Sequence, residues 1–266
     1  MESLESTFDI ADRARAELAD LIDLQMAPLG LAAMNELGPI LGKSVLDVGC
    51  GAGQATLQLS ERVGSCGRVI GVDIAPHVLE VARRRLADVT TVSLIQADAA
   101  RLSLPNYVDF AFSRFGVMFF SNPAEAFCNL KRMLRPGGRM SFVCWRSIKE
   151  NDLDLVPLAA ARVETPDSAH VSFENPQFIN DMLSSVGLVE IRVRPFDAEV
   201  SCGDIEATLS VVTRVGALGK YLREHPCERP SLVPRVRSAL SERAKSGQVS
   251  LKAATWIVTA RNTSGE

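Results

Sequence analysis

Three closely spaced glycines follow a short apolar run in the stretch V-L-D-V-G-C-G-A-G-Q-A-T-L-Q-L, residues 45–59. Gly49, Gly51 and Gly53 occupy alternate positions. Glycine adopts unusual backbone angles at little cost and lets a ligand approach the backbone closely. A turn of this kind between a first parallel strand and the following helix is typical of nucleotide-type binding sites. The pattern therefore predicts a turn that contacts a ligand.

The glycine spacing separates this turn from two common phosphate-binding patterns. The dinucleotide fingerprint G-x-G-x-x-G would need a glycine at position 54, where the chain has Gln54. No G-K-S or G-K-T follows the turn, so the lysine and the hydroxyl that serve a nucleoside triphosphate are missing. The sequence thus disfavours a nicotinamide oxidoreductase. It also lacks the residues that would be the main evidence for a phosphate ligand.

Short β-branched runs alternate with helical patterns around this turn, and these elements must position it. We expect strands at 44–48, 68–73, 92–97, 107–113 and 139–145, with helices at 54–63, 76–88 and 123–134. Alternation of strand and helix predicts an α/β fold whose parallel sheet is covered on both faces.

The patterns outside residues 44–145 are weaker. We expect a helical N-terminal cap over 1–43, broken around Pro28 and Gly30. A loop of roughly 30 residues, which we interpret as a lid, should follow Trp145. The remaining expected elements are a helix at 176–186, a strand at 188–194, two or three helices within 204–246 and a last strand at 249–261. We expect one domain, 1–266, with a core at 44–145, the lid, strand six and a helical insertion at 146–248, and the last strand and tail at 249–266.

Composition excludes several function classes. The 29 Lys and Arg residues are balanced by 32 Asp and Glu residues, and the net charge of -3 disfavours a nucleic-acid partner. The six cysteines include no C-x-x-C pair, and the acidic start M-E-S-L-E-S does not resemble a signal peptide. The most apolar window, 110–120, is too short to span a bilayer. We therefore expect a cytoplasmic protein with reduced thiols and no transmembrane segment.

The stretch D-V-G-C-G-A-G resembles the first motif of the class I S-adenosylmethionine-dependent methyltransferases. L-R-P-G-G-R-M, 134–140, is similar to the family's turn before strand five. The resemblance implies a Rossmann-like, doubly wound, mostly parallel seven-stranded sheet with helical insertions after strands five and six. It also implies S-adenosylmethionine as cofactor. S-R-F-G-V-M-F-F, F-V-C-W-R and W-I-V-T-A-R are similar to a bacterial branch of UbiE-type small-molecule methyltransferases.

The resemblance also implies roles for residues that follow the first four strands. Asp73, in G-V-D-I, matches the acid that binds both ribose hydroxyls, and Asp98 and Ala99, in Q-A-D-A, match the adenine contact. Ser113 matches the position that lines the methionine end. Asp47 is expected near the cofactor's ammonium, with an anion neighbour of the helix N-terminus as the alternative. The full predicted cofactor set is Gln25, Asp47, Gly49, Cys50, Gly51, Gly53, Asp73, Ile74, Asp98, Ala99 and Ser113.

The acceptor side carries fewer signals. His170 lies in the expected lid and is the candidate base or orienter, with an exposed loop histidine as the alternative. The candidate acceptor-pocket residues, which could equally be core packing, are Phe115, Met118, Phe119, Trp145 and Phe173. No D-x-D-like metal constellation is present, so we expect metal-independent transfer to a small organic O, N or C nucleophile. A cofactor-binding protein with a cyclase-like or partner role fits the same motifs.

Overall fold

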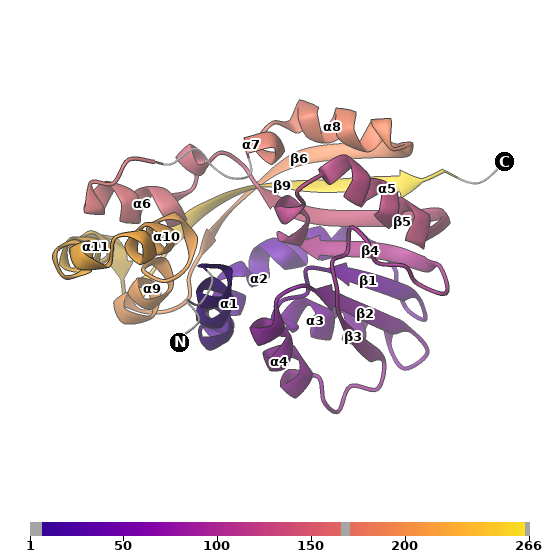
Figure 1. The fold of residues 1–266 in the computed structure, drawn as a ribbon, viewed down its shortest axis with the longest axis horizontal. Coiled ribbons are helices and arrows are strands. Elements are labelled where there is room, and N and C mark those ends of the chain that lie inside the picture. The colour runs from indigo at the N-terminus through magenta and orange to yellow at the C-terminus, as the bar shows by residue number, and fades with distance from the viewer. Residues whose placement is uncertain (1–6, 166–170, 264–266) are drawn as a thin grey trace, which may run out of the picture. The chain divides into compact units, whose positions relative to one another are not determined.

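The structure is a computed structural model that describes residues 7–165 and 171–263 (Figure 1). These residues form two compact units. Unit 1 comprises the described parts of Met1–Pro28, Arg146–Val171 and Asp197–Ala254, and unit 2 comprises those of Leu29–Trp145, Ser172–Phe196 and Thr255–Glu266. The single domain expected from the sequence stays a prediction. None of the helices in the described ranges has the length and apolarity to cross a membrane.

The seven-stranded sheet has the order β3-β2-β1-β4-β5-β9-β6. The strands are β1 (Ser44–Val48), β2 (Arg68–Asp73), β3 (Val92–Gln96), β4 (Val108–Arg114), β5 (Leu134–Trp145), β6 (Leu188–Val200) and β9 (Leu251–Asn262). Strands β1 to β5 are parallel, and β9 is antiparallel to β5. The predicted fold class is thus confirmed. The strand order reverses between β1 and β4, the point at which open α/β sheets bind ligands beyond the carboxyl ends of the strands.

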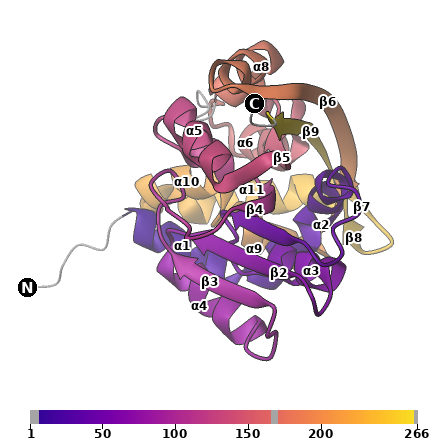
Figure 2. The same ribbon diagram turned by 90° about the vertical axis from the view of Figure 1, so that its right-hand side faces the viewer.

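Helices cover both faces of the sheet in unit 2. These are α3 (Gln54–Val63), α4 (Pro76–Arg85), α5 (Pro123–Met133), α7 (Val171–Glu174) and α8 (Pro176–Ser185), with a 3₁₀ turn, η1 (Gly116–Phe119), after β4. Right-handed crossovers place α3 and α5 on opposite faces, because the chain winds in opposite directions on the two sides of β1 (Figure 2). The core between α5 and the sheet includes Phe112, Phe127 and Phe142, all fully buried.

Unit 1 is helical and has a hydrophobic core of its own. It contains α1 (Thr7–Glu17), η2 (Ile148–Glu150), α6 (Asp152–Ala161), α9 (Ile205–Val212), α10 (Gly216–Glu224), η3 (Pro226–Glu228), α11 (Arg229–Arg243) and the short β7–β8 pair, Ala244–Lys245 and Gln248–Val249. Leu158, Leu209, Leu222 and Val236 belong to this core and come from α6, α9, α10 and α11. The two or three helices predicted for 204–246 are therefore confirmed as three α-helices.

Two expectations about the helices are wrong. α2 (Ala19–Asn35) continues through Pro28 and Gly30 instead of breaking there. A side chain on Gly30 would lie 2.8 Å from Cδ of Arg114, so this glycine serves close packing rather than a turn. The loop expected after Trp145 contains η2 and α6. Its local sequence, D-L-D-L-V-P-L-A-A-A, has an internal proline, and the helix is held by burial of Leu158 and Ala161 in the unit 1 core.

Candidate functional site

The glycine turn is fixed at the carboxyl end of β1 by backbone hydrogen bonds to β2. The amides of Gly49 and Cys50 both donate to the carbonyl of Val72, at 2.8 and 3.0 Å. Nη1 of Arg85, on α4, donates to the carbonyl of Ala52 at 2.8 Å. The turn is therefore held from both sides before α3 begins.

The three glycines of this turn are required for different structural reasons. Gly49 has φ +72°, and a Cβ there would lie 2.6 Å from Cα of Gly116, so packing alone requires glycine. A Cβ on Gly53 would lie 2.9 Å from Cδ1 of Leu86. Gly51 has φ +54°, and no described atom outside its immediate chain neighbours would come within 4 Å of a Cβ there. Gly51 is therefore the position at which a ligand could approach the backbone.

The Asp73 carboxylate is oriented by two backbone amides at the end of β2. Oδ2 accepts from the amide of Gly51 at 2.8 Å, and Oδ1 accepts from the amide of Ala75 at 2.9 Å. The Asp73 carboxylate, which is predicted to bind the ribose, therefore lies beside the open backbone at Gly51. The next side chain, Ile74, is 57% exposed, so an apolar surface lies next to the carboxylate.

The end of β3 has a similar arrangement. Oδ1 of Asp98 accepts from the amide of Ala100 at 2.9 Å, and Ala99 is buried. Nδ2 of Asn129, on α5, donates to the carbonyls of Ala99 and Leu102 at 3.0 and 2.8 Å. Sequence reasoning missed Asn129, because its partners lie far away in the chain. The adenine role of Asp98 and Ala99 stays a prediction.

Asp47 is a buried carboxyl with one unpartnered oxygen. Oδ2 accepts from Oγ1 of Thr56 at 2.6 Å, but Oδ1 is buried and bonds to none of the described residues. Burial raises the pKa of Asp47 to about 6, while the Thr56 hydrogen bond and the Arg114 charge oppose that shift. A cationic ligand group beside Oδ1 would satisfy it and favour the ionised form. The structure thus fits the ammonium role predicted for Asp47, without testing it.

Sequence reasoning also missed the side chains that surround Asp47. Nη1 of Arg114 donates to Oε1 of Gln54 at 2.5 Å, which links the end of β4 to the start of α3. Thr56 lies in the first turn of α3, at a position that the local pattern does not distinguish from other buried helix residues. Cys50 is buried beside these groups, and burial raises the pKa of its thiol far above the ordinary range. That environment suits a small, uncharged turn residue, and the predicted cofactor contact of Cys50 stays a prediction.

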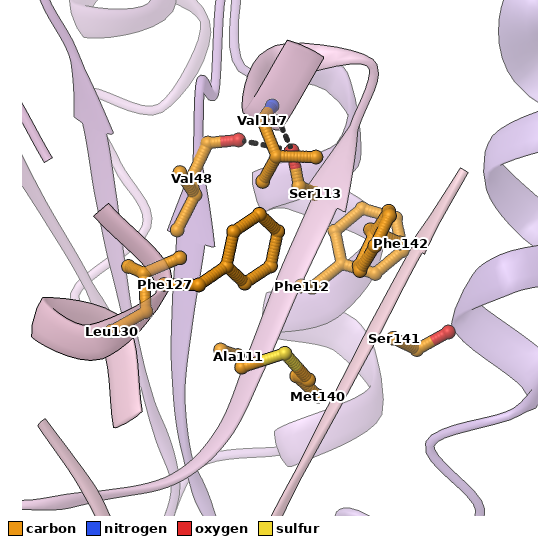
Figure 3. Close-up of a pocket in the computed structure, with 10 residues that line it drawn as sticks. All are labelled: Val48, Ala111, Phe112, Ser113, Val117, Phe127, Leu130, Met140, Ser141 and Phe142. Carbon is orange, nitrogen blue, oxygen red and sulfur yellow. Dashed lines mark hydrogen bonds between the residues drawn. The ribbon is translucent and has the colours of Figure 1, made fainter. Parts of the chain in front are cut away.

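Ser113 bridges two backbone segments (Figure 3). Its hydroxyl donates to the carbonyl of Val48 at 2.7 Å and accepts from the amide of Val117 at 3.2 Å. The side chain is only 1% exposed. These bonds give Ser113 a structural task at the junction of β1, β4 and η1, and its predicted contact with the methionine end stays a prediction.

The acceptor-pocket candidates lie in four different environments. Phe115 and Trp145 follow β4 and end β5, and their rings stack with centroids 4.2 Å apart and planes 16° apart. Met118 is buried, and its sulfur accepts from the amide of Trp145 at 3.3 Å. Phe119 is 62% exposed, whereas Phe173 is buried in the core beside Phe127 and Phe178. Phe115, Met118 and Trp145 are thus the predicted acceptor residues that the structure brings together.

Two predicted residues lie outside this group. Gln25 belongs to unit 1, where it is buried and its Nε2 donates to Sγ of Cys202 at 3.7 Å. His170 lies outside the described residues. Their roles at the cofactor and the acceptor stay predictions.

Comparison with known proteins agrees with this geometry. Residues 46–142 match a family described as "Methyltransferase domain". A demethylmenaquinone methyltransferase of Staphylococcus aureus strain MRSA252 is 36% identical over 106 residues, which cover 40% of this chain and 44% of the relative. The protein of the same name from strain JH9 is 26% identical over 185 residues, which cover 63% of this chain and 77% of the relative. The chain thus spans less than half of one relative and about three quarters of the other.

Solved structures show the same fold at low identity. A SAM-dependent methyltransferase from Aquifex aeolicus has a TM-score of 0.51 at 19% identity, covering 98% of this chain and 95% of that one. Phosphoethanolamine N-methyltransferase 2 from Haemonchus contortus, solved with S-adenosyl-L-methionine, has a TM-score of 0.59 at 18% identity, covering 97% and 60%. The motif order, the matched domain and the fold agree: residues 46–142 match a methyltransferase domain, and the chain is similar to the class I S-adenosylmethionine-dependent methyltransferases of the UbiE-like type.

Proposed function

We propose that the enzyme transfers the methyl group to a flat, ring-containing small organic acceptor, such as a phenol or a hydroquinone. The observation that carries the proposal is the stacked Phe115–Trp145 pair. Both residues lie at the carboxyl ends of their strands, the edge at which the glycine turn also lies. Stacked aromatic rings offer an apolar surface for a planar ligand.

The backbone of Phe115 supports a functional interpretation of this pair. Its φ is +65°, a left-handed conformation that costs a residue with a Cβ roughly 1–2 kcal/mol. The amide of Phe115 donates to the carbonyl of Val143 at 3.0 Å, which helps to hold this conformation. Strained residues that the surrounding structure holds in place occur often at ligand sites.

For methyl transfer, the chain mainly has to align the methyl donor with the acceptor and exclude water from the site. S-adenosylmethionine supplies a sulfonium methyl that is already electrophilic, so we infer in-line displacement without a metal ion. Asp73 and the open backbone at Gly51 would hold the adenosine part, and Asp47 would face the ammonium. Phe115 and Trp145 would then orient the acceptor. We infer that the acceptor is a small molecule, because a net charge of -3 disfavours a nucleic acid.

The relatives support a ring acceptor. The Staphylococcus aureus proteins are named as demethylmenaquinone methyltransferases, and the acceptor in that name is a quinone-type ring. A flat aromatic surface formed by Phe115 and Trp145 would suit the same kind of ligand.

A labelled-methyl assay tests the proposal. The purified protein is incubated with labelled S-adenosylmethionine and matched sets of hydroquinones, phenols and alkyl amines. We expect turnover with ring acceptors, and Trp145→Leu should lower kcat/KM at least about tenfold with S-adenosylhomocysteine affinity nearly unchanged. Tyr107→Leu is the control, because this exposed tyrosine lies at the opposite end of β4. Methylation of alkyl amines alone, or equal losses in the two variants, would contradict the ring acceptor. Cofactor binding without turnover on any acceptor would favour the non-methylating alternative.

A further inference from the structure

Unit 1 contains a cavity lined by four arginines. Its volume is about 280 Å³, and all of its lining residues belong to unit 1. The lining comes from α1, from the segment between α9 and α10, from α10 and from the start of α11, helices that Figure 1 shows grouped together. The lining residues are Ile10, Arg13, Ala14, Thr213, Arg214, Arg223 and Arg229.

Two of the arginines form ion pairs with acidic residues of α1. Nη2 of Arg13 lies 3.6 Å from Oδ2 of Asp9, and Arg214 pairs with Glu17. Both pairs are partly exposed, and exposed ion pairs contribute little to stability. Asp9 and Glu17 therefore neutralise part of the positive charge of the cavity wall.

The other two arginines are held by neutral oxygens instead. Nη1 of Arg223 donates to the carbonyl of Arg214 at 2.6 Å. Arg229 donates two hydrogen bonds to Thr213. Its Nη1 donates to the carbonyl at 3.2 Å, and its Nη2 donates to Oγ1 at 3.4 Å. Neither guanidinium forms an ion pair within the described ranges, and Nε of Arg223 is buried without a hydrogen-bond partner there. These contacts hold the two side chains without pairing either guanidinium directly with a carboxylate.

The surroundings reinforce the positive character of this wall. Burial and the nearby charge of Arg15 lower the pKa of Arg223, and Glu224 acts in the opposite direction. Holding several guanidinium groups around one cavity is unfavourable unless an anion joins them. Guanidinium groups are planar forks that match carboxylate and phosphate oxygens.

We propose that this arginine cavity binds the phosphate or carboxylate group of a small molecule, with Arg223 and Arg229 as the anion-binding residues. The cavity volume of about 280 Å³ lies at the lower limit of drug-sized ligand pockets, so the ligand is smaller than a nucleotide cofactor. The site is additional to the proposed methyl-transfer site, whose described residues near the glycine turn all belong to unit 2.

Anion titration of the 266-residue protein tests the proposal. Inorganic phosphate and malonate are titrated separately by calorimetry at constant ionic strength, and the two arms distinguish a phosphate ligand from a carboxylate ligand. We expect saturable binding of at least one probe, weakened about tenfold or more by Arg229→Gln. Arg229→Lys should restore part of the affinity, because it keeps the charge but loses the fork. The matched control is Arg235→Gln, since Arg235 is exposed on the same helix and does not line the cavity.

The outcomes separate this site from the proposed function. Arg223→Gln provides a second test if Arg229→Gln does not fold, and far-UV circular dichroism with thermal unfolding checks the fold of every variant. Failure of both probes to bind the wild-type protein would overturn the anion site, as would equal binding in Arg229→Gln and Arg235→Gln. Either result would leave the labelled-methyl assay unaffected. Conversely, anion binding that persists in a protein without methyl transfer would support the cavity and count against the proposed function alone.

Discussion

The two units bring chemically active residues together in different ways. In unit 2 the predicted cofactor residues lie at the ends of successive parallel strands, so a local sequence motif predicts each of them. In unit 1 the cavity arginines come from four segments spread between α1 and α11, and none of the four lies in a recognisable binding motif. A site at a sheet edge is therefore readable from spacing, because the fold fixes where strand ends meet. A site made between helices depends on packing that no short stretch encodes.

Replacing Gly49 should give the largest effect. Gly49→Ala would place a Cβ 2.6 Å from Cα of Gly116 at φ +72°, so we expect a loss of roughly 4 kcal/mol in the free energy of unfolding. Gly51→Ala meets no described atom within 4 Å and should cost only about 1–2 kcal/mol, yet it should abolish most cofactor binding. Denaturant unfolding and S-adenosylhomocysteine calorimetry measure the two effects.

Gly42 supplies the matched control for Gly51. It has φ +71°, it too has nothing within 4 Å of a built Cβ, and it precedes β1 rather than following it. Gly42→Ala should therefore lose similar stability while retaining full cofactor affinity. If both alanine variants bind S-adenosylhomocysteine equally well, Gly51 does not lie against the cofactor.

Loss of the Asp73 carboxylate should come next. Asp73→Ala should weaken S-adenosylhomocysteine binding by roughly 2–4 kcal/mol, because charge-assisted bonds to two hydroxyls are lost together. Asp109→Ala is the control: its carboxylate also accepts from a backbone amide, that of Ser44 at 2.8 Å, but at the amino end of the sheet. This variant should lose stability and not affinity. An unchanged dissociation constant in Asp73→Ala would remove Asp73 from the ribose site.

The sequence predicted the sheet and the glycine turn because both follow from local spacing. β1, β2 and α3 have the expected bounds, whereas β5 begins at Leu134 instead of 139. The failures share a different cause. α2 continues through Pro28, and α6 forms in the expected loop, because tertiary packing overrides the local signals of proline and low periodicity. Hydrogen-bond partners such as Thr56 for Asp47 were missed for a similar reason, since helical context alone does not mark which buried polar residue faces a carboxyl.

Asp47 should make the stability of unit 2 depend on pH. Its folded pKa of about 6 lies above the ordinary value of 3.8, so between about pH 4 and pH 6 the folded protein holds a proton that the unfolded chain has lost. Stability should therefore fall as pH rises through this window, by about 3 kcal/mol in total. Asp47→Asn should remove that slope, and at pH 8 it should stabilise the ligand-free protein by about 2 kcal/mol while weakening cofactor binding. Denaturant unfolding at several pH values measures the slope; an equal slope in both proteins would show that Asp47 ionises normally.

Ser113→Ala should give the smallest effect and decide between two roles. The substitution leaves the amide of Val117 without its acceptor, so we expect a loss of about 1–2 kcal/mol in the free energy of unfolding. Ser141→Ala is the matched control, because that hydroxyl is also buried and donates to the carbonyl of Ala33 at 2.7 Å. If Ser113 acts only as a backbone bridge, both variants should keep wild-type affinity for S-adenosylhomocysteine. If it also lines the methionine end, as the family resemblance implies, Ser113→Ala alone should lose affinity, and calorimetry on the pair separates the two outcomes.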